Sequence, residues 1–321
     1  MQAKMQRLRL VACLLNVSEA RSKPIVESIA HSAIGNTKPL NETSLKCSST
    51  VLNIFSDLDY NRSVITIAAP VDSIEESVFR ACKTAYEEID LSKHRGGHPR
   101  LGAVDLVPLH PITPSVTLEE CGKIAINIGR RITDTIKGSS VFFFGHADLP
   151  LKRGLVTRRK AVRWYEGKGD MTFDGIGWDI GPAPTPRYGC TGVGAIPYVT
   201  NCNVTIDTKD LSLGKKIAAS IRATSSEGLP GVQSMAFAHE GMVEIACNVE
   251  ALEELTDEGT FNYTSANNIE ERIKEMASTA GVELYGTKVV GYTPEEAYHR
   301  AKNALEQGNS TAWETSKEYR M

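Results

Sequence analysis

The same order of strands and helices is predicted twice along this 321-residue chain, before and after a segment rich in glycine and proline at residues 166–197. In the first half, apolar runs and helical periodicity predict strand, helix, strand, strand, helix and strand. Their expected ranges are 10–16, 18–34, 51–55, 63–69, 73–89 and 103–109, followed by a helix at about 117–136 and a strand at 140–145. Ser18 is expected to cap the first helix, and Ser73 with Glu76 is expected to form a capping box for the second.

Beyond the break the order recurs, with strands at 198–206, 231–238, 242–249 and 282–290, helices at about 211–223 and 268–281, and a terminal helix starting near residue 294. Two such sets predict an α+β protein with two tandem ferredoxin-like (βαββαβ) subdomains, residues 1–186 and 187–321. Two sheets joined in this way are expected to leave a groove for a small molecule. GCTGVGAIP, residues 189–197, is assigned to the break, and the polar tail GNSTAWETSKEYRM is expected to be frayed.

Charge and cysteine usage exclude several classes of partner. A net charge of -3 provides no global field to attract nucleic acid or an anionic membrane, so any basic site must be local. No stretch approaches the roughly 20 apolar residues that span a bilayer, and the short apolar run near the N-terminus is interpreted as a strand rather than a signal peptide. The seven cysteines are scattered without a Cys-x-x-Cys pair, which predicts reduced thiols in a cytoplasmic protein.

Residues 92–105, SKHRGGHPRLGAVD, combine histidines and cations with a backbone that cannot continue a helix. His98 is the candidate proton carrier, because an imidazole accepts and returns a proton near neutral pH. Arg95 and Arg100 could bind carboxylates, and Asp105 could orient the ring or an arginine, or could be a buried carboxylate bonded to the loop backbone. The alternative for the whole loop is a solvated turn in which His94 acts as a cap. No metal site is expected, since His94 and His98 lack helical register and further ligands.

A second candidate is the turn SDLDYNR between two predicted strands, which carries Asp57, Asn61 and Arg62. Taken alone, it is interpreted as an Asx-type turn with solvated charge. Asn16, after the first strand, is interpreted as a turn residue or cap. In the split βαβ arrangement, however, Asn16, this tip and the 93–105 loop could share one wall of the groove.

Other catalytic and binding classes lack their motifs. The chain has no Gly-x-Ser-x-Gly elbow and no phosphate loop, and GCTGVGA lacks the dinucleotide-binding spacing. An RNA-binding sheet is disfavoured by the charge and by Phe142, Phe143 and Phe144, which are typical of a buried strand.

Several segments together resemble one family. LLNVSEAR, SDLDYNRSV, IDLSKHRGGHPRLGAVDLVP, WDIGP and GLPGVQSM are similar to the glutamate formiminotransferases, which also form the N-terminal part of formimidoyltransferase-cyclodeaminase. The resemblance implies two ferredoxin-like subdomains enclosing a folate tunnel, commonly in a homodimer, with tetrahydrofolate as co-substrate. It implies that a formimino (or formyl) group moves between N-formimino-glutamate and N5 of tetrahydrofolate, with His98 as general base and acid. It also implies folate or substrate contacts for Asn16, Asp57, Asn61, Arg62, His94, Arg95, Arg100, Asp105 and Trp178.

The chain departs from the family pattern at a few positions. Gly97 and His146 stand where members usually have acidic residues, and Ile196 and Pro197 replace an Arg-Lys pair. Losing both cations leaves a folate tail or a substrate carboxylate less neutralised. The alternative functions are a catalytically weak relative that binds or senses folate, and a scaffold with a relic site.

Overall fold

The computed structural model describes residues 8–34, 45–162, 177–252 and 261–315. The chain divides into two compact units, residues 1–196 with 297–321, and residues 197–296. This partition differs from the expected division at residues 186 and 187. The change of unit comes at residue 196, and the chain returns to the first unit at residue 297. Residues 166–176 of the expected boundary segment lie outside the described residues.

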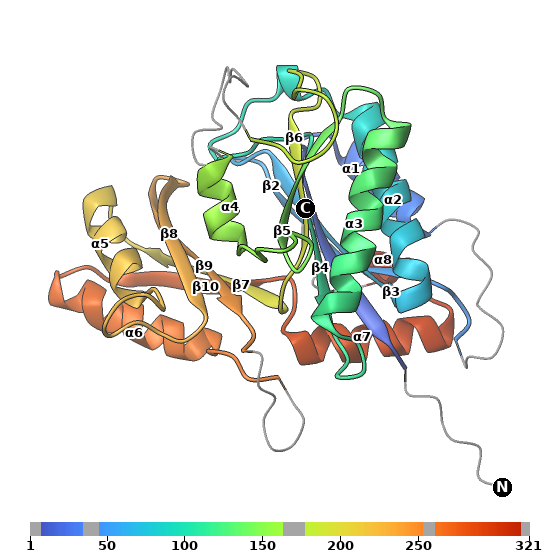
Figure 1. Ribbon diagram of the computed structural model, residues 1–321. Helices are drawn as coiled ribbons and strands as arrows, with labels where there is room; N and C mark the ends of the chain where they lie inside the picture. Colours follow the sequence, from blue (N-terminus) through green and yellow to red (C-terminus); the bar gives the residue numbers. More distant parts are fainter. Residues whose placement is uncertain (1–7, 35–44, 163–176, 253–260, 316–321) are drawn as a thin grey trace, which may run out of the picture. The chain divides into compact units, whose positions relative to one another are not determined.

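The described residues of the first unit build a six-stranded sheet in the order β2-β3-β1-β4-β6-β5 (Figure 1). β1 is antiparallel to both β3 and β4, whereas β4, β6 and β5 run parallel to one another. The strands are β1 (Leu10–Val17), β2 (Thr50–Asp57), β3 (Arg62–Pro70), β4 (Val104–Pro111), β5 (Ser140–Gly145) and β6 (Cys190–Ala195). The protein is thus α+β with a mixed sheet.

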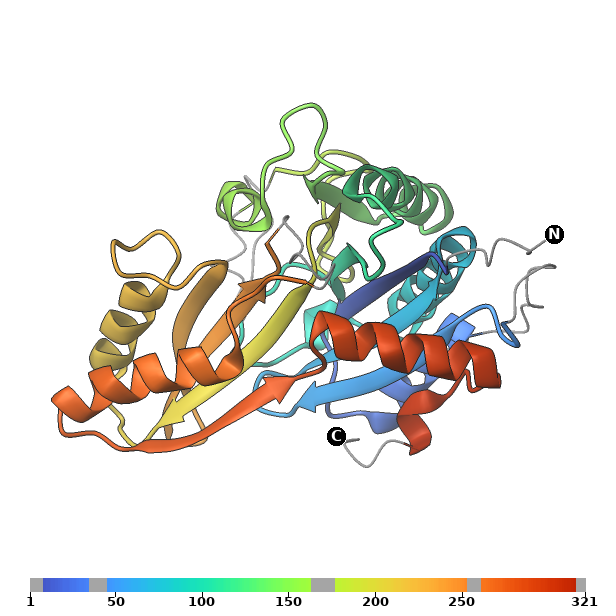
Figure 2. The same ribbon diagram turned by 90° about the horizontal axis from the view of Figure 1, so that it is seen from below.

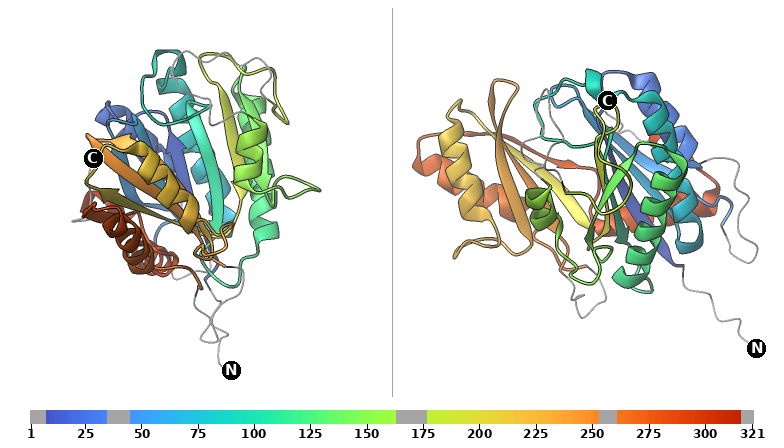
Figure 3. Two further views of the ribbon diagram at one scale, coloured as in Figure 1. Left: turned by 90° about the vertical axis from the view of Figure 1, so that its left-hand side faces the viewer. Right: turned by 45° about the horizontal axis from the view of Figure 1, so that its top comes forward.

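Three helices, α1 (Lys23–Ile34), α2 (Val71–Glu88) and α3 (Leu118–Thr135), cover one face of this sheet (Figure 1). Every second residue of β1, from Val11 to Val17, belongs to the core beneath them. Because neighbouring strand residues point to opposite faces, Asn16 lies on the face away from these helices. The short helix α4 (Leu155–Ala161) packs on β5 on that opposite side (Figure 3).

Strand β6 corrects the assignment of residues 189–197 to a domain break. Its six residues are all buried, and it pairs with both β4 and β5. Its glycines are explained by packing, since a Cβ on Gly192 would lie 2.5 Å from the Phe142 ring and one on Gly194 would lie 2.5 Å from Phe144. Glycine-rich composition therefore marks a close approach of aromatic rings here, not a loop.

The predicted helix caps were wrong in two places. Ser18 donates its hydroxyl hydrogen to the carbonyl oxygen of Gly102 at 2.7 Å, and α1 begins only at Lys23. α2 has Pro70 at its N-cap and no side-chain cap. Ser18 instead ties β1 to the segment before β4, a tertiary bond that helix-capping statistics do not anticipate.

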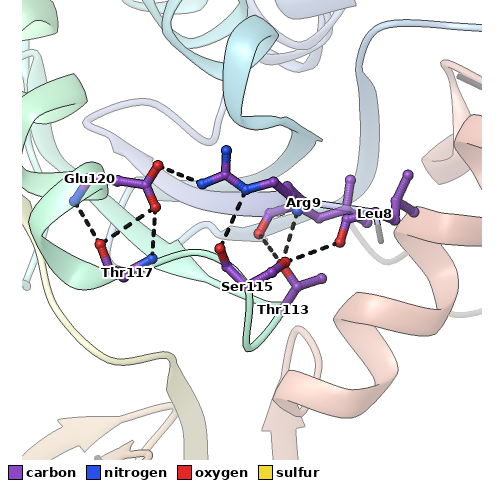
Figure 4. A network of polar contacts seen from close by, with 7 residues as sticks. Leu8, Arg9, Thr113, Ser115, Thr117 and Glu120 are labelled. Atoms are coloured by element: carbon purple, nitrogen blue, oxygen red, sulfur yellow. Dashed lines mark hydrogen bonds and ion pairs between the residues drawn. The ribbon is translucent and has the colours of Figure 1, made fainter. Parts of the chain in front are cut away.

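A capping box does occur at the start of α3, where Thr117 and Glu120 exchange side-chain and backbone hydrogen bonds. The Glu120 carboxylate also accepts from Arg9, whose Nε donates to the Ser115 carbonyl at 3.3 Å (Figure 4). This network joins the start of β1 to the start of α3.

Residues 308–315 of the C-terminal segment are packed against the first unit, contrary to the expected frayed tail. Trp313 of α8 (Ala312–Thr315) is 0% exposed and belongs to the first unit's core. The backbone N–H of Val51 donates to Ser310 O at 3.0 Å, so this segment also covers the edge of β2. Residues 316–321 lie outside the described residues.

The second unit has a four-stranded antiparallel sheet in the order β10-β7-β9-β8. Its elements are β7 (Val199–Ile206), α5 (Leu211–Ile221), β8 (Val232–His239), β9 (Met242–Glu250), α6 (Ala266–Thr279) and β10 (Leu284–Val290). α5 and α6 lie side by side on one face of this sheet (Figure 2). The helix α7 (Pro294–Gln307) follows, near the expected start.

Replacing Gly194 by Ala is expected to destabilise the protein by about 1–3 kcal/mol, because the added methyl overpacks β6 against Phe144. Urea unfolding would measure this change. Gly286→Ala is the matched control, since Gly286 is also in a strand but a methyl added there would have no atom within 4 Å. Equal stability of both variants would contradict the packing explanation of β6.

Candidate active site

The hairpin tip between β2 and β3 is bonded to the 93–100 loop. Asn61 adopts a left-handed backbone with φ of 49°, a conformation that asparagine tolerates better than most residues. Its side-chain oxygen accepts from Ala20 N at 2.9 Å, and its Nδ2 donates to Arg95 O at 3.2 Å. Asn61 is buried, and its side chain links the hairpin tip to the segment after β1 and to the 93–100 loop.

Gly96 lets the loop approach this tip closely. The Gly97 N–H donates to Asp59 O at 3.1 Å. A Cβ on Gly96 would lie 2.1 Å from the carbonyl oxygen of Tyr60, whereas a Cβ on Gly97 would have only ordinary contacts, at 3.9 Å or more. Gly96 is therefore required by the backbone contact, and a side chain at position 97 fits.

His94 is a buried neutral histidine that supports the loop. Its Nδ1 donates to Ser18 O at 2.9 Å, which makes it a tertiary brace rather than the cap of a solvated turn. Burial, and secondarily the Arg100 charge, lower the pKa of His94 to about 4. A group with this pKa is uncharged at neutral pH and is unsuited to shuttling protons there.

His98 is half-buried and contacts the hairpin. One guanidinium nitrogen of Arg62, Nη1, lies 3.2 Å from Nδ1 and 3.1 Å from Nε2 of the imidazole. The Tyr60 ring centroid is 5.1 Å from that of His98. Nδ1 is also 2.8 Å from its neighbouring carbonyl, Pro99 O. The imidazole thus meets a cation and an aromatic ring from the hairpin.

Arg62 is in turn held by Asn16. Its Nη2 donates to Asn16 Oδ1, and Asn16 Nδ2 donates to Leu14 O at 2.7 Å. Asn16 is therefore not a turn residue but a strand residue that faces the site from β1. Burial lowers the pKa of Arg62, and the charge of Asp105 opposes that shift.

The other charged residues of the loop divide by exposure. Asp105 is 1% exposed and accepts from Leu101 N at 2.7 Å, as in the backbone-bonded alternative. Arg100 is 6% exposed, donates to His94 O at 3.4 Å, and has its pKa lowered to about 10 by burial. Arg95 is exposed and donates to His94 O at 2.8 Å.

Asp57 accepts from Tyr60 N at 2.9 Å, which is the Asx-type turn that the tip sequence suggests. Tyr60 itself was missed as a site residue. Its place in the charged tip was the available signal, but its contact with His98 depends on the pairing of tip and loop.

Trp178 is not brought to His98. Its indole N–H donates to Gly181 O at 3.0 Å, and Ile180, two residues further along the chain, pairs with Val141 of β5. Arg62, the partner of His98, is on β3, and β1, β4 and β6 lie between β3 and β5 in the sheet. At the usual strand spacing, β3 and β5 are about 19 Å apart.

The other departures from the family pattern lie at the far end of the sheet. His146 follows β5, and its Nδ1 is 3.2 Å from Glu119 Oε1. The carbonyl oxygen of Ile196 accepts from His110 Nδ1 at 3.1 Å. Ile196 is the last residue of the first unit before the chain enters the second.

The described residues contain no group of three or more His, Cys, Asp or Glu side chains placed to hold a metal ion. Within the same residues, every helix is too short or too polar to cross a bilayer.

Comparisons with known proteins identify the same family that the sequence resembles. Residues 10–196 match the family model described as formiminotransferase domain, N-terminal subdomain. The chain is 29% identical to a glutamate formimidoyltransferase of Thermoplasma acidophilum, over 94% of this chain and 96% of the relative. It is 30% identical to one from Streptococcus pyogenes serotype M1, over 90% of each chain. A formimidoyltransferase-cyclodeaminase of Dictyostelium discoideum is 29% identical, and the chain covers 54% of its length.

Gly96→Ala should separate the loop from the tip, because the added methyl meets the Tyr60 carbonyl. We expect a loss of about 1–3 kcal/mol in the free energy of unfolding and faster hydrogen exchange of the Gly97 amide. Gly97→Ala is the adjacent control and should change neither by a comparable amount.

Acidification should weaken the protein through His94. Its folded pKa, about 4, lies below the ordinary value of 6.5, so between these values the unfolded chain binds more protons and stability falls as pH falls. The shift corresponds to about 3 kcal/mol lost between pH 7 and pH 4. Denaturant unfolding of wild type and His94→Gln across this range would test it, since the variant should lack this component. An unchanged pH dependence would contradict the assignment.

Proposed function

This chain belongs to the formiminotransferase family, and from that premise we propose that it moves a formimino group between N-formimino-glutamate and N5 of tetrahydrofolate. Its transferase class follows from the family and from relatives named glutamate formimidoyltransferase. Folate as co-substrate, and His98 as the group that moves the proton, are the specific parts of the proposal. The observation that carries them is the contact of His98 with Arg62, which joins two segments distant in sequence.

The reaction needs one group that first takes and then returns a proton. When the pterin N5 amine bonds to the one-carbon centre, N5 must lose a hydrogen ion, and the glutamate nitrogen must gain one as its bond to that carbon breaks. A single imidazole can do both in turn. The neutral imidazole is the form able to accept that proton.

The substrate supplies carboxylates, for which we propose Arg62, Arg95 and Arg100 as binding groups. Asp57 would contact reactants from the tip, and Trp178 would contact folate away from the proton transfer. Asn61, His94 and Asp105 have polar atoms bonded to loop backbone. We assign these three the shaping of the site.

We further propose that the two units are ferredoxin-like modules. Each has the element order βαββαβ, and the strand orders β4-β1-β3-β2 and β10-β7-β9-β8 are equivalent. The folate site would lie on the sheet face that carries Asn16 and Arg62. A homodimer and a cytoplasmic location complete the proposal, and the seven free cysteines are compatible with a reducing compartment.

The purified chain should form 5-formimino-tetrahydrofolate from N-formimino-glutamate, and His98→Ala should lower kcat about 100- to 10,000-fold. Absorbance of the product would be followed, with N-formyl-glutamate as a second donor. His31→Ala is the control, because His31 is an exposed imidazole on α1. If His98→Ala retained full activity, His98 would be removed from the mechanism.

A folate-binding or folate-sensing protein is the second candidate, favoured by the absence of cations at Ile196 and Pro197. It predicts tight calorimetric binding of 5-formyl-tetrahydrofolate without turnover of either donor. Turnover by the wild-type chain would exclude this candidate.

A further inference from the structure

The contact between Arg62 and His98 is a stack over the imidazole face. The two ring nitrogens point in different directions within the ring plane, so a donor in line with one of them would be clearly farther from the other. Arg62 Nη1 is nearly equidistant from both, at 3.2 and 3.1 Å. It therefore lies above the ring, the arrangement in which a guanidinium packs on a planar π-system.

The edge of the imidazole is held separately by the backbone. Nδ1 lies 2.8 Å from Pro99 O. A carbonyl oxygen only accepts hydrogen bonds, so Nδ1 carries the hydrogen and Nε2 of the neutral ring carries the lone pair. One contact over the face and one at the edge together define the direction of that lone pair.

Arg62 needs an anchor of its own to hold this stack. Its Nε is buried without a hydrogen-bond partner among the described residues, so that atom does not fix the guanidinium. Nη2 is bonded to Asn16 Oδ1. Asn16 is 7% exposed, and its other amide atom is bound to the backbone of its own strand through Leu14 O. The acceptor is thus placed by the central strand β1.

We propose that Asn16 and Arg62 are positioning residues that orient the His98 ring and select its tautomer, so that Nε2 is the atom that exchanges the proton. This inference rests on the proposed function and deepens it. It assigns Arg62 a task distinct from carboxylate binding, and it gives Asn16 a task that requires no contact with substrate.

The proton balance follows from this geometry. Nε2 takes the hydrogen ion released by N5 after the new carbon–nitrogen bond forms, giving an imidazolium with hydrogens on both nitrogens. It gives the same hydrogen ion to the glutamate nitrogen as the old carbon–nitrogen bond breaks. Nδ1 keeps its hydrogen, which remains hydrogen-bonded to Pro99 O throughout, so the ring returns to its starting state.

Kinetics of four variants test the positioning role. Asn16→Ala and Arg62→Gln should each lower kcat about 10- to 100-fold, as expected for a misplaced catalytic group. Asn16→Ala should leave KM within about twofold, because Asn16 does not bind substrate in this scheme. The double variant should be no slower than Arg62→Gln alone, and Asn16→Asp, which keeps the acceptor, should recover most of the rate. Additive losses, or a failure of Asn16→Asp to recover, would overturn the inference.

Two control substitutions separate positioning from general effects. Asn53→Ala removes another buried amide from the neighbouring β2, and Arg21→Gln removes a cation that donates to Leu58 O on the tip. Both lie outside the Asn16–Arg62–His98 chain. Rate losses equal to those of Asn16→Ala and Arg62→Gln would also overturn the inference.

A spectroscopic measurement separates this inference from the proposed function. Long-range proton–nitrogen NMR at about pH 8, with His98 assigned through His98→Gln, reports which ring nitrogen carries the hydrogen. Wild type should show hydrogen on Nδ1, and Asn16→Ala and Arg62→Gln should show a mixture. Hydrogen on Nε2 in wild type, or an unchanged tautomer in both variants, would overturn the inference. Absence of turnover with the expected NMR result would refute only the proposed function.

Discussion

The backbone approach of Gly96 to the Tyr60 carbonyl is the contact on which the site depends. It is possible only because position 96 lacks a Cβ, and it brings the loop against the hairpin tip. Asn61 then bonds to both the loop and the segment after β1. With three backbones tied together, Arg62 can stack on His98 without a long flexible reach. The geometry of the candidate site is thus built from main-chain contacts first and from side chains second.

The two histidines of one short loop have opposite tasks for a physical reason. His94 faces inward to Ser18 O, where burial and the nearby Arg100 disfavour its charged form. His98 is half-buried beside the tip, and its Nδ1 is hydrogen-bonded to the carbonyl oxygen of the next residue, Pro99. The loop therefore places a neutral, buried histidine and the proposed proton carrier four residues apart. Residue type alone does not distinguish them, because the distinction is one of environment.

Where sequence interpretation failed, the error came from reading local signals without their tertiary partners. Serine is a common helix-capping residue, yet the Ser18 hydroxyl donates to Gly102 O. The glycines of β6 indicate a loop until Phe142 and Phe144 are placed against them. The tail around Trp313 reads as polar and frayed, although that one indole is fully buried in the first unit. In each case long-range packing overrides a local preference.

The sequence by itself determined the number, type and order of most elements, because apolar periodicity reflects which face of each strand or helix is buried. It also singled out His98 in a loop dense with polar groups, whereas Arg62 and Asn16 became candidates only through the expected fold and the resemblance to the family. Only the tertiary structure decided that Arg62 lies over the His98 ring and is held by Asn16, and that Trp178 lies across the sheet. Strand order and register set these distances, and both arise from pairings between residues that are far apart along the chain.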